Sequence, residues 1–416
     1  MTQAPEVDIA IEAVASGCPV ADWSSQGPPR APMSYYAEMD RLRSEADVLK
    51  VNEGAGFTFY TRYEQILEIA QHPEYFSNQT IDPRTNKPGG YELVPQSSDG
   101  AKHAKWRRVL GSYFSPGRIE KLLPSIRGRA IELIESFADR GHCDFVKEFA
   151  QLYPTAIFLD IMGLPADQLS KFMAWEKDIL HPAASDMDEA IRISQTAQQE
   201  VTDYFVEMLV QRRAIPAEQR GKDLVSEALT WKIDGEPIDE NDLLSFYLLM
   251  FEAGLDTVTA EISWGFHHLA THPVDRDRIV SDPAVIPAAV EELLRVYPMV
   301  TISRFVTEDN EIGGCPLKAG ERVMLSLPSA GRDENVYENS TTVNFDRGTI
   351  QHLTFGAGPH RCLGSHLARH ELATAYAEFH KRIPNYRLAD GAEFTETHSG
   401  LFGLTSLPLV WDVEGK

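Results

Sequence analysis

Residues 355–364 of this chain read Phe-Gly-Ala-Gly-Pro-His-Arg-Cys-Leu-Gly, a glycine-rich loop with one cysteine, directly before a helix-like run over residues 363–382. Glycine is needed where the backbone turns tightly or approaches a bound group closely. The N–H groups of such a loop, with the N-terminus of the following helix, stabilise an anion and lower the pKa of a thiol. The stretch therefore predicts that Cys362 is held as a thiolate, with Phe355 lying beside the sulfur as a shield.

A thiolate held in this way suits an iron centre, and a single proximal cysteine is one known way of holding haem iron. The alternative is a structural cysteine in a turn before a helix. That alternative would be preferred for an isolated Cys-x-Gly, but the full ten-residue run favours the iron ligand.

A second segment, Ala-Gly-Leu-Asp-Thr at residues 253–257, lies within a long apolar run over residues 239–271 that has helical spacing. Glycine inside a helix costs about 1 kcal/mol relative to alanine, so Gly254 indicates that something approaches the backbone there. The hydroxyl of Thr257 can donate to the carbonyl of Ala253 and distort the helix locally. An ordinary core helix with a tolerated glycine is the alternative.

The third segment, Glu-Leu-Leu-Arg at residues 292–295, places a carboxylate and a guanidinium one helical turn apart. Exposed pairs of this kind are common and contribute little to stability. The motif is weak by itself, and it gains weight from its position between the long helix and the cysteine loop.

Together the three segments resemble the motifs of the cytochrome P-450 superfamily, in the family's order and spacing, and the resemblance runs from about Tyr35 to Trp411. It implies a mainly α fold with a small β-rich region, in which haem lies between the long central helix and the helix after the cysteine loop. Cys362 is then the ligand of the iron of haem b. Thr257 and Asp256 are the catalytic residues, which serve oxygen activation and proton relay.

The same resemblance implies the groups around the haem. Glu292 and Arg295 form a structural pair on its proximal side, with no catalytic role. The two propionates need cationic or hydrogen-bonding partners, for which solvated surface charge is the alternative interpretation. The expected partners are His103, Arg107, Arg304 and His360. The expected neighbours of the macrocycle are Phe355, Gly358 and Gly364 in the cysteine loop, and Ala253 and Gly254 on the long helix.

The substrate pocket is inferred from the resemblance and from apolarity, since apolar walls with few polar groups fit a hydrophobic guest. Each lining residue could equally belong to the core. The expected lining residues are Tyr91, Leu93, Val94, Leu249, Met250, Val300, Thr301, Ile302, Leu401, Phe402 and Leu404.

Periodicity and turn residues predict the remaining elements. Helices are expected over residues 33–46, 63–71, 103–113, 116–140, 145–162, 166–180, 188–213, 239–271 and 287–296. Strands are expected over residues 48–51, 57–61, 322–327 and 404–410. Residues 77–100 have little periodicity and predict a long loop over the pocket. No Gly/Ser linker divides the chain, so we expect a flexible arm over residues 1–32 and a single haem-thiolate monooxygenase domain over residues 33–416.

Composition limits the partners and the compartment. The chain has 62 acidic and 39 basic residues and a net charge of −23, which disfavours nucleic acid and anionic membranes as partners. Residues 1–23 contain no long apolar run, so no membrane anchor is expected. Four cysteines without paired spacing fit a reducing compartment, so Cys18, Cys143 and Cys315 are expected to be free thiols. We expect a soluble cytoplasmic monomer, as in bacterial members of the family.

The activity implied by the resemblance is insertion of one atom of O2 into a hydrophobic small molecule, by hydroxylation or epoxidation of a terpenoid, fatty acid or steroid-like compound. Two electrons come ultimately from NAD(P)H through a ferredoxin reductase and a ferredoxin. The basic residues within 102–129, with Arg361 and Arg369, form the expected docking face.

Two alternatives stay open. One is a haem-thiolate peroxygenase or isomerase that uses no partner electrons, against which the Asp256–Thr257 pair argues. The other is a haem sensor or electron carrier, against which the size of the chain and its long loop argue.

Overall fold

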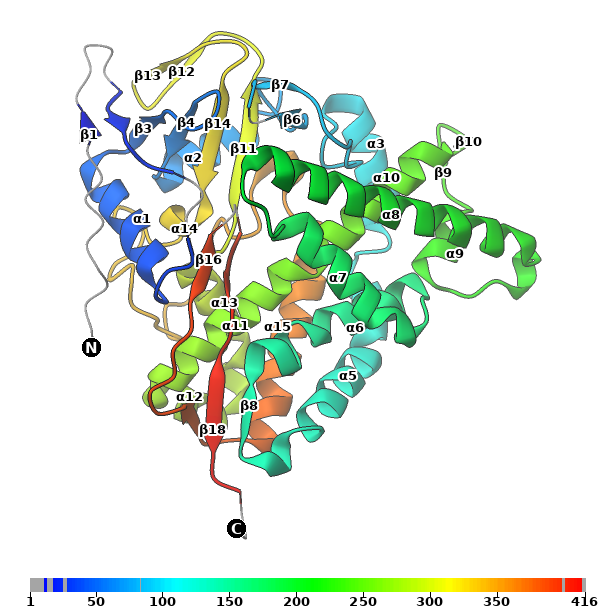
Figure 1. Ribbon diagram of the computed structural model, residues 1–416, viewed down its shortest axis with the longest axis vertical. Helices are drawn as coiled ribbons and strands as arrows, with labels where there is room; N and C mark the ends of the chain where they lie inside the picture. The colour runs from blue at the N-terminus through cyan, green and yellow to red at the C-terminus, as the bar shows by residue number, and fades with distance from the viewer. Residues whose placement is uncertain (1–10, 13–17, 25–27, 83, 399–400, 414–416) are drawn as a thin grey trace.

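The computed structural model describes residues 11–12, 18–24, 28–82, 84–398 and 401–413 of the chain. A broad helical part occupies most of the molecule, and a smaller β-rich part lies at one side (Figure 1). The β-rich part joins segments near the N-terminus to segments between residues 301 and 326. This arrangement confirms the predicted mainly α fold with a small β-rich region.

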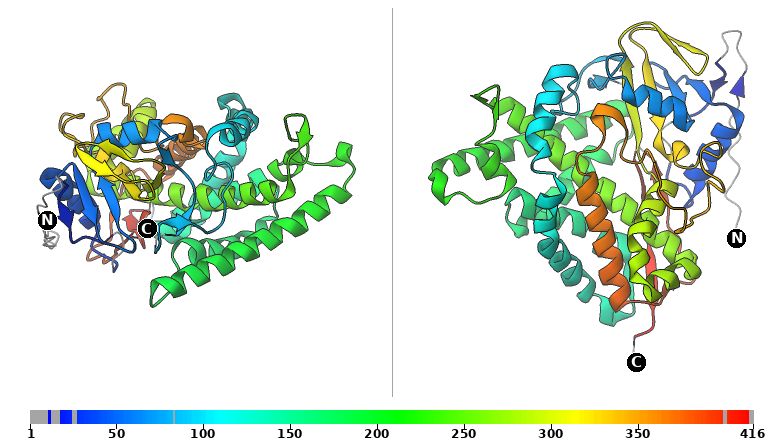
Figure 2. Two further views of the ribbon diagram at one scale, coloured as in Figure 1. Left: turned by 90° about the horizontal axis from the view of Figure 1, so that it is seen from above. Right: turned by 180° about the vertical axis from the view of Figure 1, so that it is seen from behind.

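The helical part is centred on α10 (Glu240–Gly254) and α11 (Asp256–Thr271). Around them pack α5 (Leu123–Glu135), α6 (Leu152–Met162), α13 (Ile286–Val296) and α15 (Ser365–Arg382). Seen from behind, α15 runs alongside α5 (Figure 2). The core between these helices is rich in aromatic rings, and the rings of Phe145 and Phe266 lie 4.1 Å apart between their centroids.

The stretch Glu240–Thr271 is long and apolar enough to cross a membrane, with a hydropathy of 1.3. In the fold it is a core helix, because 56% of its most apolar window is buried inside the protein. Trp264 and Phe266, for example, have no exposed surface. Its apolar composition therefore follows from its central position.

The predicted helix over residues 239–271 is present but divided. Leu255 separates α10 from α11 with φ −98° and ψ −70°. The hydroxyl of Thr257 donates to the carbonyl oxygen of Ala253 over 2.8 Å, as predicted. This bond gives the carbonyl a partner at the place where the regular helix is interrupted.

A second group of helices covers one side of the central pair. It contains α3 (Gly100–Gly111), α7 (Leu169–Leu180), α8 (Met187–Ala214) and α9 (Leu224–Ala228). Seen from above, α8 reaches the edge of the molecule (Figure 2). The side chain of Asp186 caps α8 by accepting from the N–H of Glu189 over 2.8 Å, which satisfies one of the free donors of the first turn.

In the described part of the chain, the largest sheet has seven strands, in the order β1-β2-β3-β4-β14-β11-β5. Their bounds are β1 Ile11–Glu12, β2 Val20–Ala21, β3 Val48–Val51, β4 Phe57–Tyr60, β14 Arg322–Ser326, β11 Thr301–Val306 and β5 Phe76–Ser77. β4 pairs with β14 in parallel, with Thr58 opposite Val323. β14 pairs with β11 antiparallel, with Val323 opposite Arg304. The strands predicted over residues 48–51, 57–61 and 322–327 are confirmed.

The remaining elements are short. The small sheets contain β6 (Ile81–Asp82) with β7 (Lys87–Pro88), β9 (Lys232–Ile233) with β10 (Glu236–Pro237), β12 (Asn310–Ile312) with β13 (Cys315–Leu317), β16 (Glu396–His398) with β17 (Phe402–Leu404), and β18 (Pro408–Trp411) between β8 (His142–Asp144) and β15 (Tyr386–Leu388). The other helices are α1 (Ser34–Glu45), α2 (Tyr63–Gln71), α4 (Pro116–Ile119), α12 (Pro273–Ser281) and α14 (Leu327–Ala330).

Other predicted elements are interrupted as well; the helix predicted over residues 145–162, for example, is a π-helical segment over Val146–Ala150 followed by α6. The helix predicted over residues 116–140 is divided into α4, a 3₁₀ turn over Glu120–Leu122, and α5. Pro124 lies in the first turn of α5, where its missing N–H does no harm, whereas within a longer helix it would remove a hydrogen bond. The strand predicted over residues 404–410 is divided between β17 and β18.

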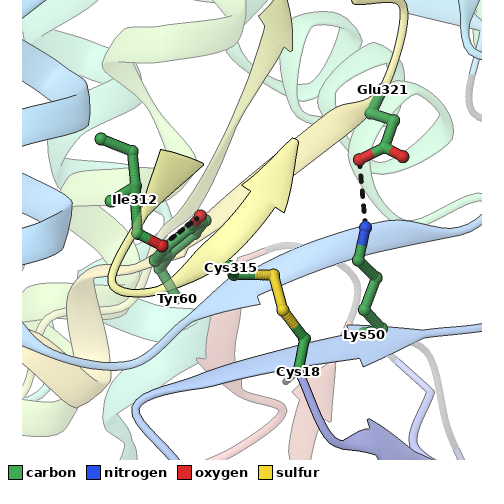
Figure 3. The surroundings of a disulfide bond; sticks show 6 residues. All are labelled: Cys18, Lys50, Tyr60, Ile312, Cys315 and Glu321. Atoms are coloured by element: carbon green, nitrogen blue, oxygen red, sulfur yellow. Dashed lines mark hydrogen bonds and ion pairs between the residues drawn. A yellow bond between two sulfur atoms is a disulfide. The ribbon is translucent and has the colours of Figure 1, made fainter. Parts of the chain in front are cut away.

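The prediction for two of the cysteines is wrong. Cys18 and Cys315 form a disulfide with a Cα–Cα distance of 5.6 Å, across a sequence separation of 297 residues (Figure 3). It joins the segment before β2 to the β12–β13 hairpin, and both side chains are buried. The sequence could not show this pairing because only the fold brings the two segments together. Cys143 is a free, buried thiol, as predicted.

The prediction of a flexible arm over residues 1–32 is also wrong for its described part after residue 17. Val20 and Ala21 pair in parallel with Lys50 and Val51 at the edge of the large sheet. Ala21 and Trp23 are buried, and the ring of Trp23 packs on that of Phe59, with 4.8 Å between the centroids. Residues 1–10, 13–17 and 25–27 lie outside the described residues.

Candidate active site

The cysteine loop is a tightly folded segment on α2. Gly356 and Gly358 have positive φ angles of 67° and 66°. A Cβ atom on Gly358 would lie 2.3 Å from the carbonyl oxygen of Ala70, so only glycine fits there. The N–H of Cys362 donates to the carbonyl oxygen of Phe355 over 2.8 Å, which closes the loop. Two residues after Cys362, Gly364 is the N-cap of α15.

The thiol of Cys362 is free and accessible to solvent, although protein atoms surround it densely. Burial raises the pKa of this thiol, while the N–H of Gly364 and the charges of Arg107, Arg361 and Arg369 act to lower it. The lowered pKa expected from the loop is therefore not found in the protein alone, because desolvation outweighs the local donors. A bound metal ion would reverse this balance, since a coordinating thiol is deprotonated.

Two imidazoles meet beside the loop. The rings of His103 on α3 and His360 in the loop stack with 3.9 Å between their centroids. Nε2 of His360 lies 3.1 Å from a carboxylate oxygen of Asp99. Burial, together with the neighbouring His360 and Arg107, lowers the pKa of His103 to about 4. His103 is therefore neutral near pH 7.

Two arginines form no ion pair with a carboxylate of the described residues. Arg304, on β11, is 7% exposed, and its only hydrogen bond in the described structure is to the carbonyl of Ser303. Burial lowers its pKa to about 10. Arg107 is half-buried, burial lowers its pKa, and no carboxylate of the described residues forms an ion pair with it. Buried cations are costly unless paired, so both sites fit a bound group that carries carboxylates, such as the two propionates of haem.

One face of the central helix is accessible. Ala253 is exposed, although it lies at the centre of the molecule's longest apolar stretch. Its helical neighbours on the same face are partly accessible, while most other residues of α10 and α11 are buried; these neighbours are Leu249, Met250, Gly254 and Thr257. This face of the central helix and Cys362 are both accessible to solvent.

Asp256 has partners that the sequence did not indicate. Its carboxylate lies 2.6 Å from Nε2 of His181, the residue that ends α7. Glu176, on the same helix, is close enough for the charge of Asp256 and burial to raise the pKa of the Glu176 carboxyl well above its usual value. Neither residue belongs to a recognisable motif, because their contact with Asp256 arises from the packing of α7 against α10.

The pair Glu292–Arg295 is buried, which excludes the exposed ion pair considered from the sequence. Nη2 of Arg295 lies 2.7 Å from Oε1 of Glu292, and both side chains are 0% exposed. Arg347 also donates to Glu292, over 2.9 Å. Arg295 further donates to the carbonyls of Gly331 and Ser340, so every charge has partners, as a buried ion pair requires.

The expected pocket residues fall into two groups. The partly accessible ones are Tyr91, Leu93, Leu249, Met250, Val300, Thr301, Ile302 and Leu401. Val94, Phe402 and Leu404 differ from the expectation, because they are buried in hydrophobic clusters. The ring of Phe402 stacks on that of Tyr35 with 3.5 Å between the centroids. Apolar composition could not separate these core residues from lining residues.

Comparison with known proteins identifies the family. The model of the family described as cytochrome P450 matches residues 52–284 and 280–382, and the chain belongs to this family. A probable cytochrome P450 127A1 from Sinorhizobium fredii is 32% identical over 361 residues, which are 86% of this chain and 84% of that protein. A steroid C26-monooxygenase from Mycobacterium tuberculosis is 29% identical over 415 residues, 99% of this chain and 98% of that protein.

Solved structures agree with this assignment. The crystal structure of CYP101J2 superposes with a TM-score of 0.85 at 26% identity, over 95% of this chain and 97% of that one. The crystal structure of CYP101C1 gives a TM-score of 0.85 at 29% identity, over 94% and 97%. The protein is thus a cytochrome P450 monooxygenase, and membership of this family implies haem as its cofactor.

Proposed function

We propose that this monooxygenase inserts one oxygen atom from O2 into a hydrophobic small molecule of the steroid or lipid class, by hydroxylation or epoxidation. The observation that carries the proposal is the exposed free cysteine Cys362 in its glycine loop, together with two arginines, the half-buried Arg107 and the buried Arg304, that form no ion pair with a described carboxylate. These are the groups that a haem with a thiolate ligand and two propionates requires.

The residues present fit the haem as follows. Cys362 would ligate the iron, and Arg107, Arg304, His103 and His360 would bind the propionates. When bound, haem supplies the binding and activation of dioxygen, which a thiolate ligand favours. Phe355, Gly358 and Gly364 would adjoin the sulfur side of the macrocycle, and Ala253 and Gly254 its opposite side.

Proton delivery is assigned to the central helix. Thr257 now donates its hydroxyl proton to the carbonyl of Ala253, and rotation of the side chain would turn this proton toward the accessible face. Asp256 would supply protons to this site, because its carboxylate lies in the first turn of α11, next to Thr257 in the sequence. Proton transfer by a positioned group is typically worth ~10²–10⁴-fold in rate.

The substrate class rests on the apolar, partly accessible residues and on the relatives. Relatives at 30% identity are named steroid C26-monooxygenase and methyl-branched lipid omega-hydroxylase. Titration of the ferric protein with cholest-4-en-3-one, lauric acid and camphor tests the proposal, because a substrate displaces the water on the iron and shifts the visible spectrum. A shift with the steroid or the fatty acid is expected, and a shift with camphor alone would contradict the proposed class.

The iron ligand is tested separately. The ferrous carbonyl complex is expected to absorb at the long wavelength typical of thiolate ligation, and Cys362→His is expected to abolish that band and the oxygenase activity. A variant Cys143→Ser provides the control, since Cys143 is the other free cysteine of the described chain. Retention of the band in Cys362→Ser would exclude Cys362 as the ligand.

We further propose that electrons come from NAD(P)H through a ferredoxin reductase and a ferredoxin, and that the protein works as a cytoplasmic monomer with a single domain. The expected docking side chains divide into two kinds. Lys105 and Arg118 form ion pairs with Asp234 and Glu227. Arg108 and Arg361 are exposed and form no ion pair with a described residue, so they support the docking role better.

A further inference from the structure

His181 connects the end of α7 to the start of α11. Its backbone N–H donates to the carbonyl of Lys177 over 2.8 Å, and its Nε2 lies 2.6 Å from Oδ2 of Asp256. The side chain of His181 is 28% exposed, and that of Asp256 is 13% exposed. One imidazole therefore touches both solvent and the carboxylate that we assign to proton delivery.

The carboxylate of Asp256 is directed toward α7 and away from the oxygen-activation face. Neighbouring residues of a helix differ by about 100° in direction, and Thr257 donates to Ala253 rather than to Asp256. A proton that leaves Asp256 toward Thr257 must therefore be replaced from another side. The contact with His181 lies on that side.

The charges around the pair favour an imidazolium. Burial lowers the pKa of His181, but the hydrogen bond and the charge of Asp256 outweigh it, so the pKa is raised above its usual value. Burial and the charge of Asp256 raise the pKa of Glu176, on α7, well above its usual value.

Two other acids near α7 have hydrogen-bond partners of their own. Glu252, one turn before Asp256 on α10, accepts from Gln198 of α8 over 2.8 Å, and burial raises its pKa to about 7. Glu200 of α8 accepts from Nε1 of Trp175 over 2.7 Å. Asp256 is thus the carboxylate that His181 contacts directly.

We propose that His181 is the solvent-side residue of the proton path, which passes protons from bulk water to Asp256. The imidazolium transfers the proton on Nε2 to a carboxylate oxygen of Asp256, and the neutral imidazole then takes a proton from water, which restores the starting state. This inference rests on the proposed role of Asp256. An arginine here could hold Asp256 equally well but could not release a proton, whereas an imidazole exchanges protons near neutral pH.

The first test is an NMR titration of the histidine side chains in the diamagnetic ferrous carbonyl form of the holoprotein. His181 is expected to titrate above the usual histidine value, and Asp256→Asn is expected to lower that value by roughly one unit or more, because an opposite charge at hydrogen-bond distance has an effect of this size. His72, which pairs with Glu74 at 2.9 Å on the surface, is the internal control. A titration of His181 that Asp256→Asn leaves unchanged would overturn the proposal.

The second test separates proton transfer from positioning. The oxygenated ferrous protein is reduced by irradiation at low temperature, then annealed stepwise, and EPR reports the temperature at which the first proton arrives. His181→Gln and His181→Arg are both expected to need higher annealing temperatures than the wild type, and His72→Gln is expected to match it.

Wild-type behaviour of His181→Arg would show that only the ion pair matters and would overturn the proposal. Absence of the thiolate carbonyl band in the wild-type protein would instead contradict the proposed function. The NMR titration decides on the His181–Asp256 pair in either case, because it needs no turnover.

Discussion

Thr257 and Asp256 are adjacent in the sequence but are held by different partners. Thr257 bonds within its own helix, to Ala253, while Asp256 bonds to the end of α7 through His181. The hydrogen bond from the hydroxyl of Thr257 to the carbonyl of Ala253 can be lost without breaking a helix, because the helix is already interrupted at Leu255. The hydroxyl is therefore available to a bound group while the fold stays intact.

Thr257→Ala is expected to leave substrate-induced spectral shifts nearly unchanged and to divert reducing equivalents from product into hydrogen peroxide. Product formed per NADH should fall by ~10-fold or more, in line with the lower range for a lost proton-transfer group. Peroxide release and NADH oxidation, measured together, check this. Thr259→Ala, whose hydroxyl donates to the carbonyl of Ala150 in the core, is the control, and full coupling in Thr257→Ala would contradict the assignment.

Glu261 is a buried acid that the proposed function does not use. It is 3% exposed, neither carboxyl oxygen has a hydrogen-bond partner among the described residues, and burial raises its pKa well above the usual value. Between the pKa values of the unfolded and the folded state, the folded protein keeps a proton on Glu261 that the unfolded chain has lost. The contribution of protonated Glu261 to the free energy of unfolding is fully present below about pH 4, and it declines as the pH rises toward the folded-state pKa of Glu261.

Glu261→Met is therefore expected to raise the unfolding temperature of the holoprotein by a few degrees at pH 8 and by less at pH 5, since an apolar side chain of similar volume removes the cost of burying the acid. Scanning calorimetry at one fixed scan rate measures the difference. Glu207→Met, at an exposed position on α8, should change little at either pH. An equal or larger gain at pH 5 would show that ionisation of Glu261 is not the cause.

At the scale of elements, the disulfide fixes β2 and the segment before it to the β12–β13 hairpin. The disulfide closes a long loop, of 297 residues. In the chain-entropy model, closing such a loop in the unfolded chain contributes about 5 kcal/mol to the stability of the folded state. Cys18→Ala or reduction with dithiothreitol is expected to lower the denaturation midpoint and to expose residues 18–24 to proteases.

The pairing itself is checked by alkylating the denatured protein without reductant, which should label Cys143 and Cys362 only. Cys143→Ala is the control. Dithiothreitol should change its stability by the same amount as that of the wild type. Alkylation of all four cysteines would show that the bond is absent. Alkylation of free thiols at the moment of cell lysis would show whether the two cysteines are reduced in the producing cells.

The predictable elements are those whose signal is local. The cysteine loop could be predicted because residue type and spacing fix it, and Glu292 and Arg295 because their motif lies between the long helix and that loop. The Cys18–Cys315 bond, the contact of His181 with Asp256 and the burial of Phe402 could not be predicted. Each of these contacts joins segments that are far apart in the chain, and the sequence alone does not show which such segments lie close together in the fold.

At the scale of the whole molecule, charge is distributed unevenly. The chain carries a net charge of −23, yet residues 102–129 hold eight basic residues and one acidic residue. Ion pairs neutralise part of this segment, including Lys105, Arg118 and Arg129. The exposed Arg108 remains, and Arg361 lies next to Cys362 in the cysteine loop, so positive charge stays uncovered near the proposed iron ligand.

This distribution predicts an acidic ferredoxin on that face. Arg108→Glu with Arg361→Glu is expected to slow ferredoxin-driven reduction mainly through the association rate, because charges that stay exposed steer encounter more than they add affinity. Reduction by dithionite and the substrate-induced spectral shift should not change. Arg192→Glu on α8, which is 69% exposed, is the matched control outside residues 102–129 and the cysteine loop.

Higher ionic strength should slow the wild type in the same way, since exposed charges are screened over ~10 Å at 0.1 M salt. Stopped-flow reduction under carbon monoxide measures these rates, and an association rate that responds neither to salt nor to the double reversal would remove these arginines from the docking face.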